Sequence, residues 1–260
     1  MIKALKIQML GIRMAFASRM AYRIDFFIST AITLAGDSII PLVTLLIYNS
    51  GVSLPGWSMY EVLLIQGIFM VSKGIVFSFF FGIVWNTLES VKDGTFDLVL
   101  LKPHPAMHLI MANAFYCDNL GILLGGITLS GIALGNLGTV SLLHFAVFAL
   151  LLVLSILVLL SLALIMAATE FKWVGNSRVD EIFDIITMFG QYPTTIFSRT
   201  FTNLLTWIIP VSMIAFMPTS ALLGRSINSL LPATLATAVL FTLSMFFWHV
   251  MKKIYTSAGG

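Results

Sequence analysis

The sequence contains few charged residues and almost no cysteine. Only 10% of its 260 residues are charged and 59% are hydrophobic, and the mean hydropathy is +1.02. A chain of this composition has too little polar surface to cover itself in water, which excludes an ordinary soluble core. Because Cys117 is the only cysteine, a disulfide within the chain and a thiol metal cluster are also excluded.

Motifs for nucleotide binding and catalysis are missing as well. A phosphate-binding loop needs G-x-x-x-x-G-K-[ST], and the sequence contains no such run. No nucleophile motif orders its serine, histidine and aspartate residues into a triad. His104 and His108 have the spacing of metal ligands on a helix, but Pro105 interrupts that turn. We therefore expect no catalytic residue, metal or cofactor in this chain.

Long apolar runs predict an all-α polytopic membrane protein, because about 20 apolar residues cross the hydrocarbon layer as a helix. The chain is expected to form one transmembrane domain over residues 1–260, with a loop over 49–58. The net charge of +3 fits membrane topology better than nucleic-acid binding, so no nucleic-acid partner is expected. The six predicted spans are 26–48, 60–85, 106–134, 142–168, 179–200 and 231–251.

The N-terminal residues 1–22 have the pattern of a helix that lies on the membrane surface. Apolar residues recur at helical spacing, and basic residues lie beside that stripe. A bend is expected near Ala21, before the first span. The stripe consists of Ile2, Leu5, Met9, Ile12 and Phe16.

Residues 204–223 are apolar but are interrupted by Pro210 and Pro218, and Pro193 precedes them. We expect this segment to enter and leave the membrane on the outer side, because broken helices need the shelter of surrounding protein. Both termini are then cytoplasmic, and eleven of the 14 lysine and arginine residues lie on the cytoplasmic side. The eleven are Lys3, Lys6, Arg13, Arg19, Arg23, Lys92, Lys102, Lys172, Arg178, Lys252 and Lys253.

Polar residues concentrate in the cytoplasmic segment 86–103. Asn86 and Glu89 have the spacing of a capping box, and Gly94 suits a helix C-cap, which predicts a short amphipathic helix. Leu88 and Val91 would share its apolar face and contact a second protein. The charges Glu89, Lys92, Asp93, Asp97 and Lys102 would surround that contact, with Phe96 and Pro103 in the same segment.

Three charged residues, Asp37, Lys73 and Asp118, are expected near mid-depth of their spans. A charge there costs ~2.5–3.5 kcal/mol, so each should face protein or water. Lys73 could pair with Asp37 or Asp118 to fix helix packing. The three residues could instead form a polar site on a substrate path, or a proton relay.

Two further patterns concern small and acidic residues. The GxxxG spacings Gly121/Gly125 and Gly131/Gly135 permit close helix approach within or between subunits. Asp180, Glu181 and Asp184 could bind a cation, but Ser177 and Asp180 resemble a helix cap with acids in the first turn.

Four segments, in order, resemble a known family. The segment Gly94 to Pro103 looks like the glycine, hydrophobic, acidic, double-leucine, basic, proline signature of one subgroup of ABC transporter permeases of the type-2 exporter class. Lys102 stands where that family usually has arginine, which keeps the charge but loses the bidentate fork. The resemblance covers roughly residues 13–255. The other three segments are 22–26, 192–197 and the paired prolines of 209–218.

The resemblance implies an exporter subunit of the cytoplasmic (inner) membrane, with a coupling helix in 86–103 and a re-entrant outer hairpin. Its partners would be two copies of an ATPase subunit, which carries the ATP and Mg, a second permease (a related paralogue or a second copy) and membrane lipid. The alternatives are an ion- or proton-coupled secondary transporter and a polytopic enzyme that modifies lipid.

Overall fold

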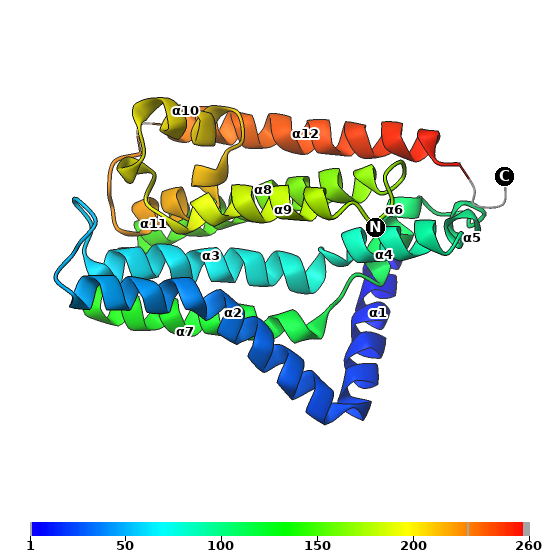
Figure 1. Ribbon diagram of the computed structural model, residues 1–260, viewed down its shortest axis with the longest axis horizontal. Coiled ribbons are helices and arrows are strands. Elements are labelled where there is room, and N and C mark those ends of the chain that lie inside the picture. The colour runs from blue at the N-terminus through cyan, green and yellow to red at the C-terminus, as the bar shows by residue number, and fades with distance from the viewer. Residues whose placement is uncertain (1, 228, 257–260) are drawn as a thin grey trace.

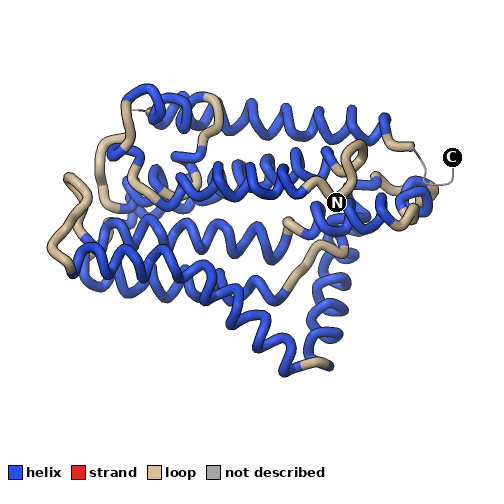
Figure 2. Tube along the Cα trace, viewed as in Figure 1, coloured by secondary structure: helices blue, strands red, loops and turns tan. Residues whose placement is uncertain are grey.

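The computed structural model describes residues 2–227 and 229–256, and all regular structure in these residues is helical (Figures 1 and 2). Met1, Asn228 and residues 257–260 lie outside the described part. The α-helices are α1 Ile2–Ala21, α2 Arg23–Asn49, α3 Met59–Phe79, α4 Gly82–Lys92, α5 Phe96–Leu100, α6 Ala106–Ala112, α7 Leu120–Leu137, α8 Leu142–Thr169, α9 Ser177–Met188, α10 Arg199–Trp207, α11 Phe216–Leu222 and α12 Leu230–Ile254.

Helix α3 is the centre of a bundle of roughly antiparallel helices (Figure 1). Together with α4, it forms the most deeply buried of the five helical segments, among the described residues, that are long and apolar enough to cross a membrane. Its first turn is fixed by a capping box, in which Ser58 accepts from the Glu61 N–H and Glu61 accepts from the Ser58 N–H. The multi-pass helical architecture predicted from the sequence is therefore present.

Helix α7 packs closely against α2 and α3 because glycines face both neighbours. A Cβ added at Gly126 would lie 2.5 Å from the backbone nitrogen of Val71, and one at Gly121 would lie 2.7 Å from the carbonyl oxygen of Thr30. By contrast, a Cβ at Gly131 or Gly135 meets nothing within 4 Å. The first GxxxG spacing thus serves packing within the chain, and the second faces open space.

The second predicted span is kinked at Phe80–Phe81, between α3 and α4. The kink frees the carbonyls of Phe77 and Ser78 from regular helical bonding. The Asn119 side chain donates to the Phe77 carbonyl at 3.2 Å, and the Tyr116 N–H donates to the Ser78 carbonyl at 2.8 Å. Both carbonyls therefore keep a partner inside the apolar bundle.

The prediction of one continuous helix over 106–134 is wrong. Helix α6 ends at Ala112, an irregular stretch and a 3₁₀ turn (Cys117–Asn119) follow, and α7 begins at Leu120. The interruption has a physical reason, because Tyr116 adopts an extended conformation where its N–H donates to a carbonyl freed by the α3–α4 kink, and Asn119 donates to the other from the 3₁₀ turn.

The segment predicted as a fifth span, 179–200, is not one helix either. Helix α9 is followed by two 3₁₀ turns, Phe189–Gln191 and Thr194–Ile196, before α10 begins. Gly190 packs against the ring of Phe69, and Pro193 lacks the N–H that a continuing helix would need. Because α9 is not among the five long apolar helices, the count of six spans stays a prediction.

The proline-rich segment forms two short helices, α10 and α11, at the end of the bundle that also holds the loop before α3 (Figure 1). Pro210 lies in the break between them, Pro218 lies in the first turn of α11, and both are buried. The carbonyl of Ile214 accepts hydrogen bonds from Ser155 and Ser72, which ties the break to α8 and α3. The hairpin begins at Arg199, earlier than the expected 204–223, and its re-entrant character stays a prediction.

Helix α1 lies across the long axis of the bundle and meets α2 at a bend (Figure 1). The bend occurs at Tyr22, where helical geometry is lost, as expected from the sequence. A Cβ at Gly11 would collide with the carbonyl oxygen of Ala112, so α1 rests directly on the end of α6. Of the predicted apolar stripe, the side chains of Ile2 and Leu5 lie outside the described part.

Candidate functional site

The segment between α3 and α7 forms α4, α5 and α6, and α5 lies at the tip of the bundle, beyond the end of α12 (Figure 1). The predicted capping box at Asn86 is wrong, since α4 begins at Gly82 and Asn86 lies in its middle. Asn86 donates to the carbonyl of Ile110 and accepts from the Tyr116 hydroxyl, both at 3.2 Å. Gly94 follows the end of α4 with φ +69°, so its predicted place at the C-cap is confirmed.

A cluster of four aromatic rings holds α5 against the rest of the chain. The ring of Phe96, whose exposed fraction is 0%, lies 4.9 Å from Phe171 and 5.0 Å from Tyr255. Phe171 in turn lies 4.9 Å from Trp248. The cluster therefore packs α5 against the residues at the ends of α8 and α12.

The surface that α5 presents outward differs from the predicted one. Val91 is only 7% exposed and packs in the chain's own core, and Leu88 is partly buried, so the expected apolar contact through these two residues is corrected. The exposed apolar side chains are instead Leu98 at 61%, Leu100 at 45% and Leu101 at 82%, of which Leu98 and Leu101 are the most exposed. The three-residue spacing of Leu98 and Leu101 is the sequence pattern that could have predicted this surface.

Exposed charged residues lie in the same segment as Leu98 and Leu101. Lys102 and Pro103 follow them directly and are exposed, and Glu89, Lys92 and Asp93 are exposed at the end of α4. Asp97 lies on the inner side of α5 near Tyr255. Burial raises the pKa of the Tyr255 phenol, and the negative charge of Asp97 raises it further.

The loop between α8 and α9 is held by a buried acid. Glu170 is buried and accepts the Gly175 N–H at 2.7 Å. Burial raises the pKa of its carboxyl, while the Gly175 hydrogen bond acts in the opposite direction. The Asn176 side chain caps α9 by accepting from the Arg178 N–H, a role expected for Ser177, whose side chain lies outside the described part.

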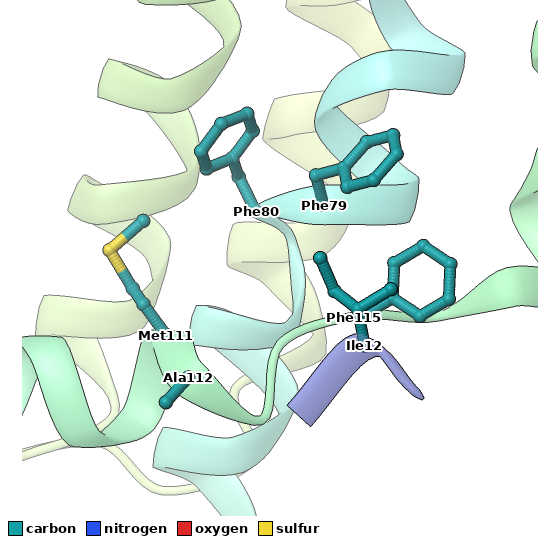
Figure 3. A pocket seen from close by; sticks show the side chains of 6 residues that line it. All are labelled: Ile12, Phe79, Phe80, Met111, Ala112 and Phe115. Atoms are coloured by element: carbon teal, nitrogen blue, oxygen red, sulfur yellow. The ribbon is translucent and has the colours of Figure 1, made fainter. Parts of the chain in front are cut away.

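A small apolar pocket of about 140 Å³ lies where α1, the α3–α4 kink and the end of α6 meet (Figure 3). Ile12 of α1 points toward the side of the kink that carries Phe79 and Phe80, and Phe115 lies beside it. The pocket therefore lies between α1 and the kink, and α1 itself packs against α6 and α2.

The three charged residues expected at mid-depth form two separate ion pairs. Lys73 Nζ lies 2.6 Å from Asp37 Oδ1, so the predicted pairing of Lys73 with Asp37 is confirmed. Asp118 instead binds Arg19 of α1, with Nη2 and Oδ2 2.9 Å apart. Its expected place at mid-depth is corrected, because it lies in the 3₁₀ turn before α7.

The Lys73–Asp37 pair lies in an open groove of about 500 Å³ between α2, α3 and α9. Asn119, Asp184 and Gln191 also line it. Among the described residues, no three histidine, cysteine, aspartate or glutamate side chains come close enough to hold a metal ion.

A family model described as "ABC-2 family transporter protein" matches residues 36–259, which is most of the chain. No curated protein and no solved structure matches the sequence significantly.

Proposed function

The chain belongs to the ABC-2 family of transporter proteins, and we propose that it is the membrane-spanning permease subunit of an ATP-driven exporter. The observation that carries this proposal is the projecting α4–α6 segment, which combines a rigid inner attachment with an exposed apolar tip. Phe96 is fully buried on one side of α5, and Leu98 and Leu101 are exposed on the other. A separate ATPase subunit that binds this tip would move the ends of α8 and α12.

The contact with the ATPase is expected to depend mainly on Leu98 and Leu101. Buried apolar residues contribute most of the energy at protein interfaces, whereas charges at the rim tune orientation. Glu89, Lys92, Asp93 and Lys102 supply that rim. The positions of α4 and α5 would be held from the inner side of the segment by Val91, Gly94, Phe96 and Asp97.

The proposed topology puts the α5 end of the bundle in the cytoplasm. The segments that meet at this end carry five basic residues, and the α10 end carries two, Arg199 and Arg225. The five are Lys92, Lys102, Lys172, Arg178 and Lys252. This distribution follows the positive-inside rule. Five long helices and α9 would then give six passes, α10 and α11 would form the re-entrant hairpin, and both termini would be cytoplasmic in the inner membrane.

The assembled exporter would contain this chain, a second permease that is either a related paralogue or another copy, and two ATPase subunits. ATP and Mg would bind only on the ATPase subunits. Gly131 and Gly135 on the open face of α7 permit close approach of another helix, which supports contact with a neighbouring subunit.

The test is to purify the tagged chain from its native membrane and identify the proteins that accompany it. An ATPase should co-purify, and Leu98→Asp/Leu101→Asp should weaken its binding about 30-fold or more, as loss of a central apolar contact worth about 2 kcal/mol predicts. Lys92→Ala, the matched control on the same projection, should have a much smaller effect.

Two results would contradict the proposal. One is normal ATPase binding and ATP-dependent transport by the doubly substituted chain. The other is transport by the purified chain alone that follows a proton gradient, which would favour the ion-coupled alternative. Lipid turnover by the chain alone would favour the enzyme alternative.

A further inference from the structure

The groove between α2, α3 and α9 combines a polar wall with an apolar wall. Its polar side chains come from all three helices and from the turns beside them, and they are Thr33, Asp37, Lys73, Asn119, Asp184, Thr187 and Gln191. Phe69, Phe77 and Met188 supply much of the apolar lining. A volume of about 500 Å³ is in the range of sites that take small organic molecules.

The groove carries one uncompensated negative charge. Lys73 is already neutralised, because its Nζ lies 2.6 Å from Asp37 and 5.2 Å from the centre of the Phe77 ring. Asp184 is exposed to the groove and makes no ion pair with any described residue. The sum over these three side chains is therefore −1.

An unpaired carboxylate in this position needs a cation. Asp184 is exposed and lines the groove beside apolar side chains, where a charge interacts more strongly than it does in bulk water. A positively charged group beside Asp184 would balance the charge of the groove. Ile40 and Met188 line the groove and keep exposed surface, so they would contact the apolar body of the same molecule.

We propose that this groove binds the transported molecule, and that the molecule is an organic cation with an apolar body. The inference rests on the proposed exporter function, and it assigns Asp184 as the residue that accepts the positive charge. Asp37 and Lys73 neutralise each other and shape the floor of the groove. The groove should therefore bind a molecule with one positive charge more tightly than a molecule of the same shape with one negative charge.

The test compares two probes of nearly identical shape and opposite charge, tetraphenylphosphonium and tetraphenylborate. The native complex is placed in phosphatidylcholine nanodiscs, and saturable binding of each radiolabelled probe is measured separately against empty nanodiscs. Tetraphenylphosphonium should bind at least about tenfold more tightly than tetraphenylborate, which corresponds to about 1.4 kcal/mol. Equal binding, tighter binding of tetraphenylborate or no saturable binding of tetraphenylphosphonium overturns the inference without any variant.

Variants at Asp184 then assign the charge. Asp184→Asn should weaken tetraphenylphosphonium binding about tenfold, Asp184→Glu should retain most of it, and Glu181→Gln should leave it unchanged. Glu181 is a matched control, because it is an exposed acid on α9 that does not line the groove. Unchanged binding by Asp184→Asn overturns the assignment.

Measuring the particle mass of each variant complex tests a second explanation, in which Asp184 contacts the neighbouring subunit. If Asp184→Asn dissociates the two permeases, Asp184 pairs with the neighbouring subunit and the inference is wrong. The proposed function is judged independently, by ATPase co-purification with the wild-type chain. Recovery of the ATPase without a cation preference would refute only the groove inference.

Discussion

Replacement of Lys73 by methionine removes one half of the ion pair between α2 and α3 and leaves Asp37 without its partner. The two charged atoms are 2.6 Å apart, and the side chains of Lys73 and Asp37 are only 23% and 14% exposed. Breaking a fully buried pair costs about 3–5 kcal/mol, and a lone charge at the centre of a membrane helix costs about 2.5–3.5 kcal/mol. Because the groove is open on one side, we expect a loss near the lower limit, about 3 kcal/mol.

That loss should be visible as a fall in thermal stability. A change of 1 kcal/mol shifts the Tm of a chain of this size by about 2–4 °C, so Lys73→Met should lower it by roughly 6–12 °C in nanodiscs. Adding Asp37→Asn removes the charge that Lys73→Met left unpaired. The double variant should therefore recover about 2 kcal/mol of the loss, measured as the coupling energy of a double-mutant cycle.

Asp118 provides the control for this cycle, since it is bound to Arg19 rather than to Lys73. Asp118→Asn combined with Lys73→Met should give additive effects. The reasoning would be refuted if Asp37→Asn did not couple to Lys73→Met, or if Asp118→Asn did.

Two further predictions concern packing and topology. Gly126→Ala should destabilise the chain by about 1–3 kcal/mol, because its Cβ would lie 2.5 Å from the Val71 nitrogen. Gly131→Ala, as the control, should leave the monomer's Tm unchanged. Equal Tm values for the two variants would contradict this packing. In a Cys117→Ala background, Thr139→Cys should react with an impermeant thiol reagent on intact cells and Thr95→Cys should not, and the reverse pattern would invert the proposed topology.

The sequence predicted the long apolar helices well because a membrane-spanning run is a local property of composition. The bend after Ala21 and the Gly94 C-cap were equally local, since each depends on a few neighbouring residues. Asp37 was one of the two partners expected for Lys73 on energetic grounds. Only the three-dimensional arrangement distinguished Asp37 from Asp118.

The failures came from contacts between segments far apart in the chain. Residues 106–134 looked like one helix, but Tyr116 and Asn119 are needed as donors at the α3–α4 kink. Val91 looked like an exposed apolar residue of a free helix, but α6 and α8 cover it. Leu98 and Leu101 were not predicted, because the capping spacing at Asn86 placed the apolar contact surface on the residues of α4 instead of α5.

At the α3–α4 kink, the bent chain and a straight helix over the same residues would make different numbers of hydrogen bonds. In the bent form the Phe81 N–H donates to Val76 at 2.8 Å, one residue further back than in a regular α-helix. Straightening would move that donor to the Phe77 carbonyl, where it would displace the Asn119 amide. The backbone bond of Phe81 is then only exchanged for another, and the side-chain bond of Asn119 is lost. The bent form therefore makes one hydrogen bond more than a straight helix would, and Asn119 stabilises the bend.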